Sequence, residues 1–586
     1  MSSIAIKTVA TTPYKDQKPG TSGLRKKTPI FMEGHYLHNF IQSTFNSLPK
    51  DRVQGCTLVV GGDGRYYSRE AIQVILKIAA GNGVGRVWVA QHGIMSTPSI
   101  SAVIRTRENG IAYGGFILTA SHNPGGLNAD FGVKFNGENG AAAAEHITNG
   151  IYTESLKISE LKMAELPEVP IDEIATLTYT VAEHPFIVEI ISSTEDYIRI
   201  LQSVFDFPRI AALFRRPDFH FHFDAINGVS GAYAGPIFHD LLGAPLDSLH
   251  NCVPKPDFGG CHPDPNLTYA RELVEAMGLD RTGQPLLKSA EEAAKIPDFG
   301  CATDGDADRA MILGRQFFIS PSDSLAMVAA YCRCIPYFQN GLTACARSMP
   351  TSSAIDVVCE RRGIRGFEVP TGWKFFGNLM DSKALGKQDN HPFICGEESF
   401  GLGADYIREK DGIFAILCWL SIVAQRNEDP EKPLEGVEAI ARDYWNEFGR
   451  HYYTRYDYEG VETAQADALM DGLRAKIAEM EGKTMVVKGV EIVKMDEFEY
   501  HDPVDGSVSS HQGIRIYTKD GARIIFRLSG TGSSGATIRM YMEKYETEKD
   551  RLMLRTADVM EKVLAAALEL SQMEAMTGRT APSVIT

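Results

Sequence analysis

Short runs of apolar, β-branched residues alternate with longer amphipathic stretches along most of the chain. Residues 57–62 predict a buried strand, followed by a helix over 69–80 and a second strand over 86–90. This alternation is typical of mixed α/β layers. Because the same rhythm returns twice, we expect repeated α/β units. The two later occurrences are a strand over 219–225 with a helix from Gly228, and a strand over 341–347 with a helix over 352–362.

The C-terminal part of the chain follows a different pattern. Residues 425–436 contain two prolines and several charges, which makes them the best linker candidate. The tail from Thr577 onward is rich in Thr, Pro and Ser, and we expect it to fray. Between them we predict a helix over 462–480, strands over 514–517 and 523–528, and a long last helix with Leu552, Val559, Val563, Ala567 and Leu570 on one core-facing stripe.

Length and apolar content narrow the class of protein. The chain has 586 residues, which at about 150 residues per domain suggests roughly four domains. No stretch approaches the ~20 apolar residues of a membrane-spanning helix, and the longest run, 413–424, predicts a buried core helix. The N-terminus lacks the apolar core of a secretory signal. The scattered cysteines form no zinc or disulfide pattern, so we expect a reducing cytoplasm.

The net charge is −16. A surface so negative repels nucleic acid phosphates and anionic lipid headgroups, so we expect neither nucleic acid binding nor membrane insertion. An anionic substrate would need basic ligands gathered in one place.

The first motif with chemical potential is Thr119-Ala-Ser-His-Asn-Pro-Gly-Gly126, after the apolar run 116–118. A serine at a strand end followed by turn residues has its hydroxyl on a tight loop, where it can act as a nucleophile. A plain Asn-Pro-Gly turn with a capping serine accounts for the motif equally well. The Gly-x-Ser-x-Gly elbow of hydrolases is absent.

The second motif, Asp304-Gly-Asp-Ala-Asp-Arg309, has carboxylates at alternating positions. Three carboxylates can converge on one hard cation such as Mg²⁺. An EF-hand is excluded because Arg309 and Arg315 stand where that loop needs glycine and glutamate. A solvated acidic turn is the weaker alternative, since Arg309 beside the aspartates indicates a phosphate ligand next to a metal.

The third motif is Arg527-Leu-Ser-Gly-Thr-Gly-Ser533, with Arg539 close behind. Its backbone amides, hydroxyls and arginines can surround a phosphate. The Gly-Lys-Ser/Thr ending of a Walker loop is missing, and a glycine-serine turn in a strand-rich domain explains the motif equally well when it is taken alone.

The fourth motif is Cys395-Gly-Glu-Glu-Ser-Phe-Gly401, in which Glu397 and Ser399 can hydrogen-bond sugar hydroxyls. Lys410 follows shortly after. It can transfer a proton if burial lowers its pKa, or bind phosphate as a cation; a solvated charge run is the simpler alternative.

Together the motifs resemble those of the α-D-phosphohexomutase superfamily, and within it the eukaryotic-type phosphoglucomutases, including the parafusin-like members. The resemblance covers almost the whole chain. The chain departs from the usual pattern of this family at Ala307, where many of these enzymes carry glycine. The substitution removes no metal ligand. Four further segments carry the resemblance: Gln17-Lys-Pro-Gly-Thr-Ser-Gly-Leu-Arg25, Val59-Val-Gly-Gly-Asp-Gly-Arg65, Ala346-Arg-Ser-Met-Pro-Thr351 and Val369-Pro-Thr-Gly-Trp-Lys-Phe375.

The resemblance implies an α/β fold of four domains around a central cleft, three of them related and the last a distinct α+β phosphate-binding domain. We expect a phosphoserine domain over 1–196, a metal-binding domain over 197–319, a sugar-binding domain over 320–432 and the phosphate-binding domain over 433–586.

The resemblance also implies roles for individual residues. Ser121 would carry the phosphoryl group and would ligate Mg²⁺ together with Asp304, Asp306 and Asp308. Arg25, His122, Lys134 and Lys410 would lie near the reacting groups, where they could take part in proton transfer. The substrate-binding residues would be Thr21, Ser22, Arg25, Arg309, Thr371, Gly372, Lys374, Glu397, Ser399, Lys410, Arg527, Ser529, Gly530, Thr531, Gly532, Ser533 and Arg539.

The implied activity is a Mg²⁺-dependent phosphoglucomutase that interconverts glucose 1-phosphate and glucose 6-phosphate, with glucose 1,6-bisphosphate as intermediate and activator. A phosphomannomutase or phosphopentomutase is the alternative within the same class. A phosphoprotein scaffold in membrane trafficking is the alternative outside it, although the chain has no lipidation signal or basic patch.

Overall fold

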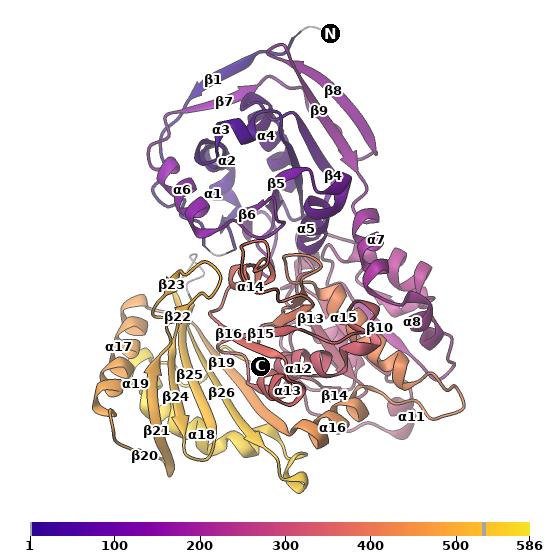
Figure 1. The fold of residues 1–586 in the computed structure, drawn as a ribbon, viewed down its shortest axis with the longest axis vertical. Helices are drawn as coiled ribbons and strands as arrows, with labels where there is room; N and C mark the ends of the chain where they lie inside the picture. Colours follow the sequence, from indigo (N-terminus) through magenta and orange to yellow (C-terminus); the bar gives the residue numbers. More distant parts are fainter. Residues whose placement is uncertain (1–2, 21, 530–534) are drawn as a thin grey trace.

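The computed structural model describes residues 3–20, 22–529 and 535–586. Four sheet-centred units follow one another along the chain (Figure 1). The N-terminal unit lies at the top of the view and the C-terminal unit at the lower left, with the two middle units beside it. No helix in these described ranges has the length and apolar character needed to cross a membrane.

Three of the sheets contain the same four-strand pattern. The first strand in sequence lies between the second and third, parallel to both, and the fourth pairs antiparallel with the third. This shared order confirms the repeated α/β units expected from the sequence. The strands are β3 (Thr57–Gly62), β4 (Arg86–Ile94), β5 (Ala112–Leu118) and β6 (Asp130–Gly137); then β10 (Phe221–Asp224), β11 (Leu249–His250), β12 (Phe299–Thr303) and β13 (Ala310–Gly314); and then β15 (Ala344–Ser348), β16 (Arg365–Val369), β17 (Phe393–Gly396) and β18 (Leu402–Ala404).

Helices cover these sheets where the amphipathic stretches were predicted. The predicted helix over 69–80 is α4 (Ser68–Gly81), and the predicted core helix is α15 (Gly412–Arg426), which is buried from Gly412 to Ala424. The helix expected from Gly228 begins later, as the short α9 (Gly231–Ala234) that continues into a π-helical stretch over Gly235–Leu241. Other helices of the three units include α2 (Tyr36–Ser47), α5 (Thr97–Thr106), α7 (Glu195–Val204), α8 (Phe207–Phe214), α12 (Pro321–Tyr331), α13 (Ala354–Arg362) and α14 (Trp373–Met380).

The N-terminal sheet extends the repeated pattern at both edges. Its order is β2-β6-β5-β3-β4-β9-β8, and a separate two-stranded ribbon, β1-β7, lies beside it. The added strands are β1 (Ile6–Ala10), β2 (Leu24–Lys27), β7 (Glu160–Ala164), β8 (Ala175–Val181) and β9 (His184–Ile191).

The C-terminal unit is a seven-stranded sheet in the order β20-β21-β24-β25-β26-β19-β27. Its helices α17 (Thr463–Glu479) and α18 (Thr556–Ser571) share a core with one face of the sheet, which confirms the two predicted helices. Leu552, which was expected on the stripe of the last helix, instead lies before α18 and packs into the core of the middle units. The helix before the sheet, α16 (Val437–Phe448), instead packs into the core shared by the middle units. The strands are β19 (Arg450–Val461), β20 (Met485–Val487), β21 (Val490–Glu497), β24 (Ile514–Thr518), β25 (Ala522–Ser529), β26 (Ala536–Glu546) and β27 (Val584–Ile585).

The expectation that the tail frays is wrong. Val584 and Ile585 form β27, which pairs antiparallel with Asp457 and Tyr456 of β19. The Thr586 amide donates to the Arg455 carbonyl at 2.9 Å, and the Arg455 amide donates back at 2.8 Å. An edge strand with free backbone groups is a ready template for pairing, and this pairing outweighs the local preference of a Thr- and Pro-rich segment for disorder.

Candidate functional site

Equivalent loops of the three related units carry the chemical motifs. In each unit the loop between the third and fourth strands of the pattern holds one motif: Ser121 between β5 and β6, the aspartates between β12 and β13, and Glu397 between β17 and β18. The second and third loops touch directly, because Arg309 and Gly401 form an isolated antiparallel bridge, beside which the Ala310 amide donates to the Phe400 carbonyl at 3.1 Å. The repeated topology therefore brings together motifs that lie far apart in sequence.

Ser121 is held rigidly at the end of β5. It is only 3% exposed and has a φ of 53°, in the left-handed region. Its amide donates to Thr119 Oγ1 at 2.8 Å, and its carbonyl accepts from Arg65 Nη2 at 2.8 Å. Arg65 is itself paired with the buried Asp63, which also accepts from Thr119 Oγ1 at 2.6 Å. A residue in this strained backbone region persists only when its surroundings fix it, and such strain clusters at functional sites.

The Ser121 hydroxyl points at the acidic loop. Its Oγ donates to Asp304 Oδ2 at 3.0 Å. The predicted serine nucleophile and the predicted metal loop are thus hydrogen-bonded neighbours. This contact favours the functional interpretation of the serine loop over a simple capped turn.

Asp304, Asp306 and Asp308 converge as the sequence predicted. All three are buried, and one carboxylate oxygen of each lies within 4.8 Å of the others. Burial, followed by the charges of Asp308 and Asp306, raises the pKa of Asp304 well above its ordinary value. Asp306 Oδ1 is buried without a hydrogen-bond partner among the described residues, and Asp308 Oδ1 makes no hydrogen bond there although Lys410 Nζ lies 3.1 Å from it. Buried carboxylates that lack donors cost free energy unless a cation compensates them, so this set fits a hard divalent ion.

The backbone of the acidic loop directs the three carboxylates toward one another. The amides of Asp308 and Arg309 donate to Asp304 Oδ1 at 2.9 and 3.1 Å. Ala307 has a φ of 62° and is fully buried, which explains why glycine suits this position. Thr97, at the start of α5, donates its hydroxyl to Asp306 Oδ2 at 2.7 Å and so orients the second carboxylate.

Four cationic or imidazole side chains border the aspartates. Lys410 Nζ lies 3.1 Å from Asp308 Oδ1. Burial alone would lower the pKa of Lys410, but Asp308 and Glu397 outweigh burial and the net shift is upward. This direction favours Lys410 as a cation over a lysine with a lowered pKa.

Arg25, Arg309 and His122 complete this border. Arg309 Nε is 3.9 Å from both Asp304 Oδ2 and Asp308 Oδ1. Burial lowers the pKa of Arg25, and the nearby Asp306 opposes the shift. Burial and the cations of Arg309 and Arg25 lower the pKa of His122 well below its ordinary value, so its ring is neutral. His122 Nδ1 lies 3.4 Å from Ser121 Oγ.

Lys134 is engaged in a buried ion pair. Its Nζ donates to Glu409 Oε1 at 3.0 Å, and Asn136 donates to the same oxygen at 2.8 Å. Since Glu409 is the neighbour of Lys410, this pair anchors the Lys410 segment to β6 of the N-terminal unit.

The sugar-loop residues lie at the edge of the third unit. Glu397 is buried, and burial raises its pKa. Its Oε1 accepts from the Gly372 amide at 3.3 Å, which links the loop to the predicted Thr371–Gly372 segment. The Thr371 hydroxyl is buried without a partner among the described residues. Ser399 is half-buried. Lys374 pairs with exposed Glu145 of the N-terminal unit at 2.7 Å.

The described part of the predicted phosphate cradle lies on two neighbouring strands. Arg527 and Ser529 are on β25, and Arg539 on β26 faces Arg527 directly in the strand register. Ser22 is exposed. Thr21, Gly530, Thr531, Gly532 and Ser533 lie outside the described residues.

Two residues that sequence reasoning missed belong to this region. Glu398 is 1% exposed and has a pKa below its ordinary value: burial would raise it, but Arg455, Arg527 and Arg539 outweigh burial. Arg455, on β19, pairs with Asp457 at 3.0 Å. Glu398 stands inside the Gly-Glu-Glu-Ser motif and could have been singled out there, whereas Arg455 belongs to no local motif.

A cavity of about 1000 Å³ lies elsewhere, at the other end of the N-terminal sheet. Its lining includes Thr57, Arg86 and His184, which are the first residues of β3, β4 and β9. Ser121 follows the opposite end of β5. Neither Ser121 nor the three aspartates are among the residues that line the cavity, so it is separate from the site.

Comparison with known families finds four matches that together span most of the chain. Three are the phosphoglucomutase/phosphomannomutase alpha/beta/alpha domains: domain I matches residues 16–162, domain II residues 195–316 and domain III residues 321–440. The fourth, the C-terminal domain of phosphoglucomutase-1, matches residues 450–583.

Full-length relatives agree with these matches. The cytoplasmic phosphoglucomutase of Pisum sativum is 53% identical over 597 aligned residues, and that of Solanum tuberosum is 52% identical over 598, each covering all of both chains. The crystal structure of the exocytosis-sensitive phosphoprotein pp63/parafusin, a phosphoglucomutase from Paramecium, in its open form, aligns over all of both chains with a TM-score of 0.90 and 47% identity.

Proposed function

The chain belongs to the phosphoglucomutase/phosphomannomutase family, and we propose that it is a phosphoglucomutase that interconverts glucose 1-phosphate and glucose 6-phosphate through phosphorylated Ser121. The observation that carries this proposal is the hydrogen bond between the Ser121 hydroxyl and Asp304 in the buried acidic cluster. It joins a nucleophile with a cation site, which is the combination that phosphoryl transfer requires.

In the proposed reaction, phosphorylated Ser121 gives its phosphoryl group to the free hydroxyl of a bound glucose monophosphate. The product is glucose 1,6-bisphosphate, which turns around and returns its other phosphate to Ser121. In the first transfer the sugar hydroxyl loses its proton and the Ser121 oxygen takes one up, and in the second transfer Ser121 loses a proton and the freed sugar oxygen takes one up. Each phosphoryl group thus passes between Ser121 and a sugar oxygen without net hydrolysis.

Asp304, Asp306 and Asp308 would hold Mg²⁺, with the phosphoserine as a further ligand. The chemistry that this ion supplies when bound is withdrawal of negative charge from the transferring group. Arg25, Arg309 and Lys410 border the same position as cations and would stabilise the same charge. Neutral His122 is close enough to Ser121 to accept or return a proton at Nδ1. Lys134 would act indirectly, because its ion pair with Glu409 holds the Lys410 segment.

Glu397 and Ser399 would bind the sugar hydroxyls, with Thr371, Gly372 and Lys374 along the adjoining loop. The phosphate that is not transferred would bind Arg527, Ser529 and Arg539, together with the Gly530–Ser533 segment, Thr21 and Ser22. Because both ends of the sugar carry phosphate in turn, the same residues must accept the sugar in two opposite orientations. By analogy with the relatives named above, we infer a cytoplasmic location.

A coupled assay of glucose 1-phosphate conversion, with Mg²⁺ and a trace of glucose 1,6-bisphosphate, tests the proposal. We expect conversion by the native protein and loss of conversion in Ser121→Ala. Mannose 1-phosphate and ribose 1-phosphate in the same assay separate a glucose enzyme from the mannose and pentose alternatives. Inactivity of the native protein on all three sugars would contradict an enzymatic function and favour the scaffold hypothesis.

A further inference from the structure

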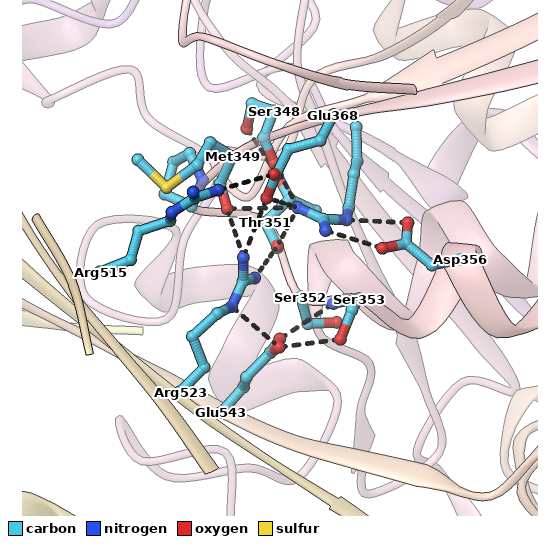
Figure 2. A network of polar contacts seen from close by, with 12 residues as sticks. Ser348, Met349, Thr351, Ser352, Ser353, Asp356, Glu368, Arg515, Arg523 and Glu543 are labelled. Atoms are coloured by element: carbon cyan, nitrogen blue, oxygen red, sulfur yellow. Dashed lines mark hydrogen bonds and ion pairs between the residues drawn. The ribbon is translucent and has the colours of Figure 1, made fainter. Parts of the chain in front are cut away.

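The C-terminal sheet meets the third unit through a buried polar network (Figure 2). At its centre Arg523 of β25 reaches the loop after β15. Its Nη1 donates to the Met349 carbonyl at 3.1 Å and its Nη2 donates to the Thr351 carbonyl at 2.8 Å. These two bonds use the planar guanidinium as a fork, so they fix the direction as well as the distance of β25 relative to the loop.

Glu543 of β26 completes this contact from the neighbouring strand. It accepts from Arg523 Nε at 3.0 Å, and from the amide and hydroxyl of Ser353 at 2.9 and 2.8 Å (Figure 2). Both charged side chains are about 5% exposed. Burial would raise the pKa of Glu543, but Arg523, His451 and Arg347 outweigh burial and lower it. The pair is therefore ionised and spans the two units.

Glu368 of β16 ties three arginines to the same place. Arg347 and Arg515 reach it at 2.9 Å, and Arg523 at 3.1 Å. Arg347 belongs to β15, whereas Arg515 and Arg523 come from the C-terminal sheet. The network thus has several charge-assisted bonds between the units, and such networks resist displacement more than a single pair does.

The strand register connects this network to the phosphate cradle. Arg523 faces Glu543, Ile525 faces Tyr541, and Arg527 faces Arg539 across β25 and β26. Alternate residues of a strand share a face, so all three pairs lie on the same side of the sheet. Ile525 and Tyr541 pack into a core with residues of the third unit, including Ala346 and Met349. Arg527 lies four residues after Arg523 on β25, which is about 13 Å along the strand at ~3.3 Å per residue.

The loop after β15 also contacts the sugar segment. The Thr351 carbonyl accepts from Arg523, while its Oγ1 accepts from the Glu398 amide at 2.9 Å and lies 3.3 Å from Glu398 Oε2. Glu398 is the neighbour of Glu397. One residue therefore holds the docking arginine on one side and the sugar motif on the other.

We propose that Arg523 and Glu543 are positioning residues of the phosphate site: they set the distance and orientation of Arg527 and Arg539 relative to the Glu397 segment. The proposal rests on the proposed function and adds residues to it that touch no substrate. Misplacement by about 1 Å costs on the order of 100-fold in rate, so a shift of this docking contact should be visible in kinetics.

The test compares Arg523→Met and Arg523→Lys with the native protein. We expect Arg523→Met to lower kcat/KM for glucose 1-phosphate about 100-fold, mainly through a higher KM, with partial rescue in Arg523→Lys, which retains the charge. Manganese affinity should not change, since the aspartates lie in another unit. The matched control is Lys544→Met. Lys544 follows Glu543 on β26 and pairs with Asp520, so this change also removes an ion pair but should leave KM unchanged.

An unchanged KM in folded Arg523→Met would overturn the proposal, and so would an equal loss in Lys544→Met. If Arg523→Met also loses manganese binding, KM and manganese affinity are measured for Glu543→Gln, which keeps the side-chain volume. An unchanged KM in Glu543→Gln would then overturn the proposal. An inactive native protein would instead contradict the proposed function, so the two failures are distinguishable.

Discussion

The hydroxyl of Ser121 lies 3.0 Å from a carboxylate oxygen of Asp304, although 183 positions separate the two residues. The contact arises because each residue occupies the loop between the third and fourth strands of its own α/β unit. Two copies of one topology, facing each other, thus bring a nucleophile to a cation site. The third copy adds Glu397 from its equivalent loop.

Thr97 should control metal affinity, because its hydroxyl orients Asp306. We expect Thr97→Val to weaken Mg²⁺ or Mn²⁺ binding about 10- to 100-fold, as is typical when a residue that orients a ligand is lost. Isothermal titration with each metal provides the measurement. Thr153→Val is the matched control, because Thr153 is exposed and its hydroxyl donates to the Asn149 carbonyl of its own helix. Equal effects of the two changes would refute a role of Thr97 in orienting the ligand.

Glu397 should act on the sugar and not on the metal. Loss of a hydrogen bond to a charged group costs about 1.5–3 kcal/mol, so we expect Glu397→Gln to lower kcat/KM for glucose 1-phosphate by about 10- to 100-fold. Manganese affinity should stay at the native value. Glu360→Gln, at an exposed position of α13 in the same unit, serves as control. Normal kinetics in Glu397→Gln would remove this residue from the sugar site.

His451 should make stability depend on pH. Burial, together with Arg523 and Arg347, lowers its pKa to about 4, so the folded state binds fewer protons than the unfolded state between pH 4 and its ordinary value of 6.5. Stability is therefore lost as the pH falls through this window, by about 2 kcal/mol between pH 7 and pH 5.

His451→Phe, which keeps an aromatic ring against Tyr545, should reduce this loss by about 2 kcal/mol. The midpoint of urea unfolding at pH 7 and pH 5 measures it for both proteins. The same loss in variant and native protein would show that His451 is not the responsible group.

Buried strands, the core helix and the compact motifs could be predicted because each depends on residues that lie close together in the sequence. The buried strand over 57–62 matches β3, and the apolar run over 413–424 lies within α15. The serine, the aspartates and Glu397 stand in compact motifs, so spacing and residue type identified them. The tail was mispredicted because the partner of β27 is β19, more than 100 residues away.

The residues that sequence reasoning missed depend on tertiary packing. Thr97 begins a helix and carries no motif, yet its hydroxyl meets Asp306 only after two units dock. Arg455 and Arg523 are ordinary strand arginines whose roles come from the strand register and from the facing loop. The role of Lys410 was ambiguous from the sequence, because the direction of its pKa shift depends on Asp308 and Glu397, which only folding brings close to it.

Mapping the phosphate tests most directly whether Ser121 carries the phosphoryl group. The native protein is treated with glucose 1,6-bisphosphate and Mg²⁺, digested and analysed by mass spectrometry, with and without a chase of glucose 6-phosphate. We predict one phosphate on the peptide that contains Ser121, loss of that phosphate in the chase, and no phosphate in Ser121→Ala. A phosphate on another residue that the chase removes, or a Ser121 phosphate that the chase leaves in place, would contradict the account.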